Sequence, residues 1–247
     1  MIALILNKEN KNYVYSLLEN VEFPEQFGFN DDTDELDCNE DILAVVNDVD
    51  AAVKSCYGAS KYVLMNDSLP YVIKIPFNGF WRELYVEDEA DSEEIEYKFI
   101  YFDGACRDSY ATDMIYNDNY CKTEMRLFQV MEEQGLDMFF ARIEYAGTIN
   151  GKEVYVQEKV IPYKRSKKTG VSSPLAEKLS STPRIYLESD WIEAAIQFYG
   201  EVLTKQFINF LSTDEDGEII GGDLHTDNYG YREDGSPCLL DYSGYNV

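Results

Sequence analysis

The segment from Gly221 to Gly244 decides the fold of this chain, and its sequence is GGDLHTDNYGYREDGSPCLLDYSG. Two short aromatic or apolar stretches, residues 229–231 and 238–240, flank the polar interval Arg-Glu-Asp-Gly-Ser-Pro. Gly and Pro in a polar interval between two such stretches are typical of a turn. The segment is therefore predicted to form a β-hairpin.

Three side chains that carry oxygen atoms lie around this hairpin. Asp223 and Asn228 precede its first strand, and Asp241 directly follows its second strand. The hairpin would bring Asn228 and Asp241 together at its open end, with Asp223 near them. Two hard oxygen ligands beside a separate carboxylate are what a site for a Mg²⁺-bound nucleotide with a base requires.

This pattern resembles the catalytic segment of the protein kinase-like superfamily, which joins protein kinases to aminoglycoside phosphotransferases. Members of that family have a catalytic Asp, an Asn about five residues later, a hairpin, and a metal-binding Asp before a Gly-containing turn. The Asp-Leu-His form of the loop is closest in style to the small-molecule branch and to the short kinases of some tailed bacteriophages. The family's Phe-Gly is replaced here by Tyr242-Ser-Gly.

The resemblance implies an α+β, two-lobed kinase-like fold with an antiparallel-sheet small lobe and a reduced helical large lobe. We expect residues 1–50 to form an acidic helical N-terminal extension. Residues 51–160 would form the small lobe, with an acidic insertion at about 79–118 that is a candidate partner surface. Residues 161–247 would form a truncated large lobe with the catalytic loop and the metal-binding hairpin.

A lysine inside an apolar strand extends the resemblance. The strand predicted at Tyr71–Pro76 places Lys74 between two isoleucines, where a carboxylate or phosphate must offset the desolvation of the ammonium group. The resemblance makes Lys74 the phosphate-binding lysine and Glu124, in a helix predicted from Asn119 to about Gln134, its ion-pair partner. Taken alone, Lys74 could be an edge-strand lysine that reaches solvent, and Glu124 an exposed residue of an amphipathic helix.

The resemblance also implies where the rest of the nucleotide binds. Gly58 and Ser60 would lie in a loop that covers the phosphates, although Lys61 occupies the position of the family's third glycine. Glu158 and Val160 would bind the adenine through backbone groups in the hinge between the lobes.

Apolar spacing and turn residues predict the other elements. Helical periodicity is present at Tyr13–Val21, at Glu40–Val53 and, as a single long helix, at Asp190–Leu211. The dipeptide Asn150-Gly151 is a strong signal for a tight hairpin. The basic, Ser-rich segment Tyr163–Pro183 could be a flexible loop, a phosphorylation site or an anion-binding patch, and a flexible loop is the default prediction.

The charge of the chain is strongly negative. Its 247 residues include 47 acidic and 21 basic ones, which gives a formal charge of -26. Such a field repels nucleic acid, so direct nucleic-acid binding is not expected. Three interpretations of the acidity stay open: a solvated surface, a surface that docks on a basic partner protein, or imitation of nucleic-acid charge.

The five cysteines are odd in number and widely spaced, which favours neither a disulfide framework nor a zinc site. No apolar run is long enough for a membrane span, and no membrane partner is expected. We expect a cytoplasmic protein, in the host cytoplasm if the chain is viral. The single histidine, His225, is expected to brace its loop rather than to transfer protons.

The function implied by the resemblance is an ATP- and Mg²⁺-dependent kinase, of the Ser/Thr protein kinase type, that transfers the γ-phosphoryl group to a hydroxyl. Asp223 would take the proton, Asn228 and Asp241 would hold Mg²⁺, and Lys74 fixed by Glu124 would position the phosphates. The activation segment and peptide-docking helices of the family are expected to be missing. The alternative is a pseudokinase, or an acidic nucleic-acid-mimicking protein that binds and inhibits a host or partner protein.

Overall fold

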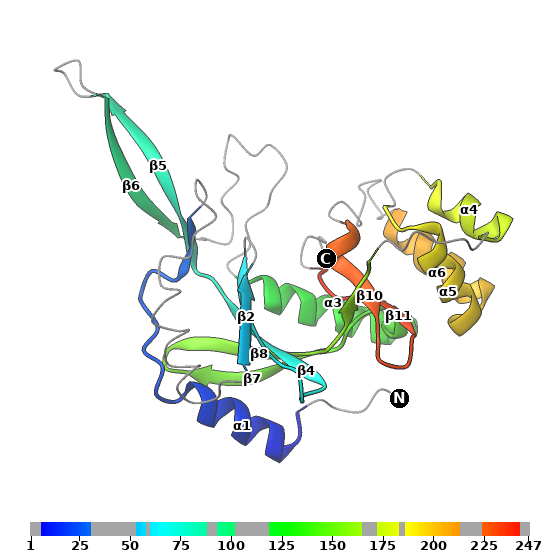
Figure 1. The fold of residues 1–247 in the computed structure, drawn as a ribbon, viewed down its shortest axis with the longest axis horizontal. Coiled ribbons are helices and arrows are strands. Elements are labelled where there is room, and N and C mark those ends of the chain that lie inside the picture. The colour runs from blue at the N-terminus through cyan, green and yellow to red at the C-terminus, as the bar shows by residue number, and fades with distance from the viewer. Residues whose placement is uncertain are drawn as a thin grey trace. The chain divides into compact units, whose positions relative to one another are not determined.

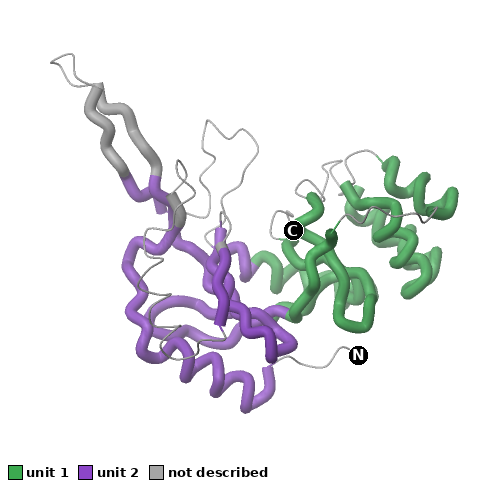
Figure 2. The backbone as a smooth tube through the Cα atoms, in the orientation of Figure 1, with its two compact units in different colours: residues 1–3, 123–143, 158–247 green, residues 4–122, 144–157 purple. Residues whose placement is uncertain are grey.

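The structure, a computed structural model, describes residues 6–30, 53–57, 60–87, 93–101, 119–164, 172–182, 186–212 and 224–242. The fold is α+β, and the described residues contain a five-stranded antiparallel sheet and five α-helices. The chain divides into two compact units (Figure 2). The sheet unit comprises Leu4–Lys122 and Glu144–Gln157, and the hairpin unit comprises Met1–Ala3, Thr123–Ile143 and Glu158–Val247.

The five-stranded sheet has the strand order β2-β3-β4-β8-β7. Figure 1 labels β2, β4, β7 and β8 of this sheet. The strands are β2 Val53–Tyr57, β3 Lys61–Asn66, β4 Tyr71–Pro76, β7 Ile143–Ile149 and β8 Lys152–Glu158. The predicted strand at Tyr71–Pro76 is confirmed with the same bounds. The helix predicted at Glu40–Val53 is wrong at its last residue, because Val53 begins β2, and its other residues lie outside the described ones.

The turn between β7 and β8 is the one predicted from Asn150-Gly151. Both residues have positive φ, 47° and 81°, as a two-residue hairpin turn requires. The Asn150 side chain also donates hydrogen bonds to the carbonyls of Leu18, Glu19 and Val21, at 3.1, 2.9 and 2.7 Å. The turn thus also binds the chain at the end of the first helix.

That first helix, α1, spans Lys8–Leu18 and packs on one face of the sheet. It begins at Asn7, whose side chain accepts a hydrogen bond from the Asn10 N–H at 2.8 Å. The helix predicted at Tyr13–Val21 thus begins earlier and ends earlier than expected, and Val21 lies after it. The four apolar positions predicted to be buried are buried: Val14, Leu17, Leu18 and Val21. They share a core with sheet residues of the same face, namely Tyr62, Leu64, Ile73, Ile75, Val154 and Val156.

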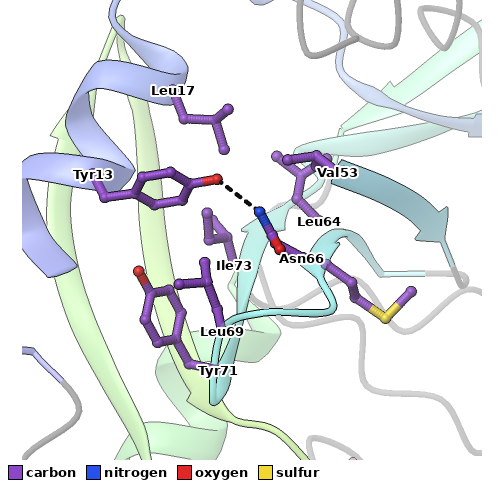
Figure 3. A pocket seen from close by; sticks show the side chains of 9 residues that line it. Tyr13, Leu17, Val53, Leu64, Asn66, Leu69, Tyr71 and Ile73 are labelled. Atoms are coloured by element: carbon purple, nitrogen blue, oxygen red, sulfur yellow. Dashed lines mark hydrogen bonds between the residues drawn. The ribbon is translucent and has the colours of Figure 1, made fainter. Parts of the chain in front are cut away.

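A group of polar atoms interrupts this apolar contact (Figure 3). The Asn66 side-chain nitrogen donates to the Tyr13 hydroxyl at 3.3 Å, and the Asn66 oxygen accepts from the Ser68 N–H and hydroxyl. The buried Tyr71 hydroxyl has no hydrogen-bond partner among the described residues. Burial raises the pKa of Tyr71 to about 12, so its hydroxyl stays protonated at neutral pH.

A long hairpin occupies the first part of the predicted acidic insertion. Strand β5 spans Gly79–Glu87 and pairs antiparallel with β6, Glu93–Tyr101. The short strand β1, Gly28–Asn30, pairs with β5 in parallel. Residues 102–118, the rest of the predicted insertion, lie outside the described residues.

Helix α3 spans Tyr120–Gln134, as predicted. The remaining α-helices of the hairpin unit come later in the sequence. The single helix predicted at Asp190–Leu211 is wrong. It is two helices, α5 Ser189–Tyr199 and α6 Glu201–Ser212, separated by Gly200 at a φ of 87°. Positive φ is strained for residues other than glycine and ends an α-helix.

The segment Tyr163–Pro183, predicted to be a loop, contains a helix. Helix α4 spans Pro174–Ser180, and the side chain of Ser173 caps it by accepting from the Ala176 N–H at 3.2 Å. Serine followed by proline is a favourable helix start, which the loop prediction did not take into account. None of the helices in the described ranges is long and apolar enough to cross a membrane.

Candidate functional site

The C-terminal segment forms the predicted hairpin. Strand β10, Tyr229–Tyr231, pairs antiparallel with β11, Pro237–Leu239, and Tyr229 lies opposite Leu239. The second strand therefore lies one residue earlier than the predicted 238–240. The turn contains Gly235 at a φ of 84°, and the Asp234 carboxylate accepts from the Ser236 N–H at 2.9 Å.

Asn228 and Asp241 meet at the open end of this hairpin, as predicted. Asn228 ends the short 3₁₀ helix η2, Thr226–Asn228, and its carbonyl accepts hydrogen bonds from the Leu240 and Asp241 N–H groups at 2.9 and 3.3 Å. These bonds use the main-chain carbonyl of Asn228, and cation binding by the side chains of Asn228 and Asp241 stays a prediction. An amide oxygen and a carboxylate are hard donors of the kind that fits Mg²⁺.

The residues before η2 include two other predicted site residues. The His225 ring accepts a hydrogen bond from the Asp227 N–H through Nδ1 at 3.3 Å, which agrees with the expected bracing role. Asp223, the predicted base, precedes the described residues 224–242, and its role stays a prediction.

Tyr242 fixes the backbone beside Asp241. Its hydroxyl donates to the Ala141 carbonyl at 2.6 Å, and its ring packs edge-on against Phe140 at 5.2 Å between centroids. The Ala141 N–H in turn donates to the Leu239 carbonyl at 2.7 Å. Tyr242 stands where the family pattern has a phenylalanine, and its contact with Ala141 was not predicted. The sequence signal was the added hydroxyl itself, because a tyrosine hydroxyl usually finds a hydrogen-bond partner when it is buried.

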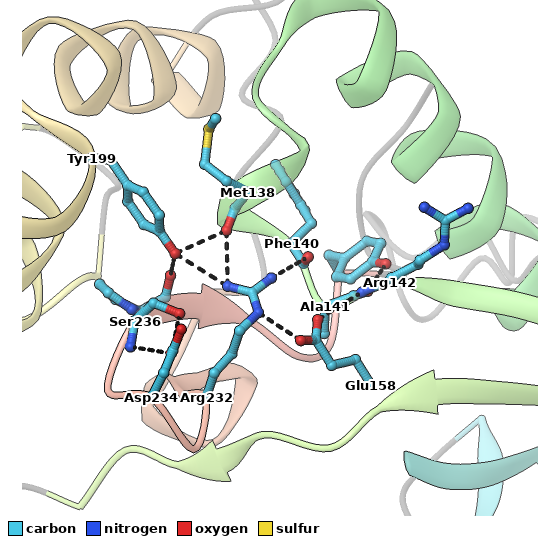
Figure 4. A network of polar contacts seen from close by, with 11 residues as sticks. Met138, Phe140, Ala141, Arg142, Glu158, Tyr199, Arg232, Asp234 and Ser236 are labelled. Carbon is cyan, nitrogen blue, oxygen red and sulfur yellow. Dashed lines mark hydrogen bonds and ion pairs between the residues drawn. The ribbon is translucent and has the colours of Figure 1, made fainter. Parts of the chain in front are cut away.

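Arg232 holds the other end of the hairpin through four hydrogen bonds (Figure 4). Its Nε donates to the Glu158 carboxylate at 2.8 Å, and Nη2 donates to the Phe140 carbonyl at 2.9 Å. Its Nη1 donates to the Met138 carbonyl at 2.9 Å and to the Tyr199 hydroxyl at 3.1 Å. This Arg232 network was missed, because its partners are far from Arg232 in the sequence.

The predicted hinge begins inside the Arg232 network. The Glu158 N–H donates to the Arg142 carbonyl at 2.8 Å, and the Glu158 carboxylate pairs with Arg232. Because the Glu158 N–H already has a partner, adenine binding by the Glu158 backbone would use its carbonyl group. Val160 lies between β8 and β9, Ile161–Pro162, and is half-buried. Adenine binding by both residues stays a prediction.

Lys74 lies on the central strand of the sheet, between β3 and β8. It is only 4% exposed, so it is not a solvent-reaching lysine on an edge strand. Its cross-strand partner on β3 is Val63, and Val63 in turn lies opposite Cys56 on β2. A lysine held at this position has its backbone fixed by hydrogen-bonded strands on both sides.

Glu124 is fully buried in α3, so it is not an exposed residue of an amphipathic helix. Glu124 belongs to the hairpin unit and Lys74 to the sheet unit, and their ion pair stays a prediction. Ser60 precedes β3, and its carbonyl accepts a hydrogen bond from the Phe77 N–H at 3.0 Å. Gly58 lies outside the described residues.

Other chemistry finds little support in the part of the chain that the structure describes. Within those ranges no three His, Cys, Asp or Glu side chains are grouped as a metal site would require. Cys238 lies on β11, and burial raises the pKa of its thiol to about 12. It is therefore a neutral, buried thiol at neutral pH, which does not suit a nucleophile.

Comparison with known proteins identifies no relative: no protein-family model matches the chain, and no curated protein matches it significantly. A functional conclusion therefore depends on the chemistry of the hairpin and of the sheet face.

Proposed function

We propose that the chain is an ATP- and Mg²⁺-dependent phosphotransferase of kinase-like fold that transfers the γ-phosphoryl group to a protein serine or threonine hydroxyl. The observation that carries the proposal is the adjacency of Asn228 and Asp241 at the open end of the β10–β11 hairpin. A catalytic segment of this spacing, followed by a hairpin and an Asp, resembles that of the protein kinase-like superfamily.

In this proposal the two units have the roles of the two lobes. The sheet unit supplies Lys74, whose ammonium group binds the phosphates of ATP. The hairpin unit supplies Asn228 and Asp241, which would hold Mg²⁺. The ion supplies charge neutralisation on the phosphate oxygens when it is bound. The position of Lys74 on the central strand β4 supports this role, because the hydrogen-bonded strands on both sides fix the backbone that carries the ammonium group.

In this reaction no covalent bond forms between the protein and the phosphoryl group. The acceptor hydroxyl oxygen forms a bond to the γ-phosphorus while the bond from that phosphorus to the bridging oxygen breaks, and ADP leaves with the electron pair. Asp223 orients the hydroxyl and takes its proton. Glu124 positions Lys74, and the Glu158 and Val160 backbones hold the adenine. The rate enhancement comes from positioning and charge stabilisation, for which few side chains suffice.

A transfer assay tests the proposal. The chain is incubated with γ-labelled ATP, Mg²⁺ and a mixture of Ser- and Thr-containing peptides, as wild type and as the variants Lys74→Met and Asp241→Asn. We expect labelled product from the wild type and a loss of at least about a hundredfold in either variant, because each removes a charge that acts on the phosphates.

Lys54→Met is the matched control. Lys54 lies on β2 of the same sheet, but it is 66% exposed and pairs with Asp67 at 2.5 Å, so its loss should leave transfer unchanged. Binding of ATP without transfer would identify a pseudokinase. An absence of ATP binding would contradict the proposal and favour a protein that acts through its acidic surface.

A further inference from the structure

We propose that strand β9 and the β10–β11 hairpin form a spacer of fixed length between the adenine and the metal of the bound nucleotide. Gly230 is the positioning residue on which this spacer depends. The inference rests on the proposed function and adds to it a reason why the site would select a nucleoside triphosphate by its length. All the residues that carry it belong to the hairpin unit.

Strand β9 is the third strand of the sheet that contains the hairpin. It pairs antiparallel with β10, and Pro162 lies opposite Gly230. The pairing continues one residue further, because the Tyr163 N–H donates to the Tyr229 carbonyl at 2.9 Å. The segment that follows the predicted hinge is thus joined to the hairpin by main-chain hydrogen bonds.

The close approach of the two strands requires a glycine at position 230. A Cβ atom added to Gly230 would overlap the Ile161 carbonyl oxygen. It would also lie 2.9 Å from the Ile161 carbonyl carbon and 3.0 Å from the Pro162 Cα. These are main-chain atoms, so no side-chain rotation can make room for the added carbon. Any other residue at this position therefore forces β9 away from β10.

Helix α5 holds both strands. The Trp191 Nε1 donates to the Gly230 carbonyl at 2.9 Å, and Trp191 is fully buried in the first turn of α5. The neighbouring Asp190 carboxylate accepts from the hydroxyl of Tyr163, the residue that follows β9, at 2.8 Å. Because the same helical turn binds β10 and the end of β9, the two strands are hindered from sliding past each other.

The two groups of predicted nucleotide-binding residues lie toward opposite ends of β10. At one end Ile161 lies opposite Tyr231, and the adjacent Arg232 donates through Nε to the Glu158 carboxylate at 2.8 Å (Figure 4). At the other end Asn228 directly precedes β10. The three residue steps from position 228 to position 231 span about 10 Å of antiparallel strand. An extended nucleoside triphosphate can span such a gap from its base to its outer phosphates, whereas a monophosphate is too short.

A spacer of fixed length favours the intact nucleotide over its separate parts. When two contact sites are held at the separation that a ligand requires, binding of one half places the other half at a high effective concentration. Mg·ATP should therefore bind more tightly than adenosine or magnesium tripolyphosphate does. If β9 is forced off β10, each part can still bind, but the gain from linking the two parts is lost.

Calorimetric titration with Mg·ATP, adenosine and magnesium tripolyphosphate tests the inference. The test variant is Gly230→Ala, which adds only the Cβ atom. The matched control is Gly200→Ala in the same unit. Gly200 lies between α5 and α6 at a φ of 87°, and an added Cβ would point into open space. Alanine at position 200 therefore strains the backbone but leaves the pairing of β9 with β10 intact.

We expect Gly230→Ala to weaken Mg·ATP binding about tenfold, because the linked parts no longer match the separation of their sites. Its affinities for adenosine and for magnesium tripolyphosphate should each change less than about twofold, since neither ligand spans the spacer. Gly200→Ala should unfold at a lower urea concentration than the wild type and still bind Mg·ATP as the wild type does.

The outcomes separate this inference from the proposed function. If Gly230→Ala binds Mg·ATP like the wild type, the inference is wrong, although the nucleotide site stands. If Gly230→Ala weakens all three ligands alike, the glycine supports the fold rather than the spacing, and the inference also fails. If the wild type binds none of the three ligands, the proposed function itself fails. Should Gly230→Ala not fold, Trp191→Phe, which removes the donor to the Gly230 carbonyl, is compared in the same way.

Discussion

Replacing Arg232 by methionine tests whether the Arg232 network holds the β10–β11 hairpin in place. The substitution keeps most of the aliphatic volume but removes all four hydrogen bonds, to Glu158, Met138, Phe140 and Tyr199. The side chains of Arg232 and Glu158 are only 12% and 21% exposed. Removing one partner of a buried ion pair costs about 3–5 kcal/mol, because the other charge is left without compensation. Since Glu158 retains some contact with water, we expect a loss near the lower end, about 3 kcal/mol.

The assay is urea unfolding of the hairpin unit, followed by tryptophan fluorescence. The chain has two tryptophans, and Trp191 reports on this unit, because its Nε1 donates to the Gly230 carbonyl of β10 at 2.9 Å. A Trp81→Phe background removes the other signal.

A double-mutant cycle adds the decisive comparison. The double variant Arg232→Met/Glu158→Gln leaves no charge at this ion pair. Its loss of unfolding free energy should therefore be smaller than the sum of the losses in the two single variants, by about 1–2 kcal/mol. A single loss below about 1 kcal/mol, or strictly additive losses, would refute the view that this ion pair anchors the hairpin.

Three further predictions concern single contacts. Tyr242→Phe leaves the Ala141 carbonyl without its hydroxyl donor, so we expect about 1 kcal/mol less stability and a higher Mg²⁺ requirement for transfer; an unchanged Mg²⁺ titration would show that Tyr242 does not position Asp241. Asn150→Ala should cost about 2 kcal/mol in the sheet unit, measured by Trp81 fluorescence, because three hydrogen bonds are lost at a residue of positive φ. Asn150→Gly should lower the stability of the sheet unit less than Asn150→Ala does. Equal losses of stability in the two variants would mean that alanine does not strain the backbone at this position. Hydrogen bonds from the Ser173 hydroxyl and N–H lower the pKa of the Glu193 carboxyl, so Glu193 contributes stability above its ordinary pKa and loses it as the pH falls through the lowered value. The stability of the wild type should therefore decline on acidification more steeply than that of Glu193→Gln, and identical pH profiles from denaturation would contradict this.

The elements that sequence analysis predicted correctly are those whose cause is local. The Asn150-Gly151 turn needs only two residues that tolerate positive φ, and the hairpin after Asn228 needs only a turn between two short strands. The buried positions of α1 follow from helical spacing within a single segment. The adjacency of Asn228 and Asp241 followed from the hairpin, because pairing two strands fixes which residues meet at their ends.

The features that escaped prediction depend on contacts between distant segments or on a single residue. Gly200 divides one apolar periodicity into two helices, and helical spacing alone does not register such a break. Helix α1 packs on the sheet through residues that lie at opposite ends of the sheet unit's sequence. The Arg232 network joins residues that are 94 positions apart, Met138 and Arg232, and no local sequence pattern indicates this contact.

The site was predictable to a similar extent. Lys74 was predicted to lie inside an apolar strand because a lysine between isoleucines is conspicuous in the sequence, and its burial on β4 confirms this placement, while its role at a phosphate stays a prediction. The pairing of β9 with β10 at Gly230 was not predicted, because it depends on the register of two strands, which spacing along one strand does not determine.

The most direct test of the central claim is a crystal structure of the chain with Mg²⁺ and a non-hydrolysable ATP analogue. The account predicts one bound nucleotide, with the Lys74 ammonium group on its phosphates and with the Asn228 and Asp241 side-chain oxygens about 2.1 Å from the metal. A nucleotide that contacts Lys74 but not the hairpin, a metal bound elsewhere, or no bound nucleotide at saturating concentration would contradict it.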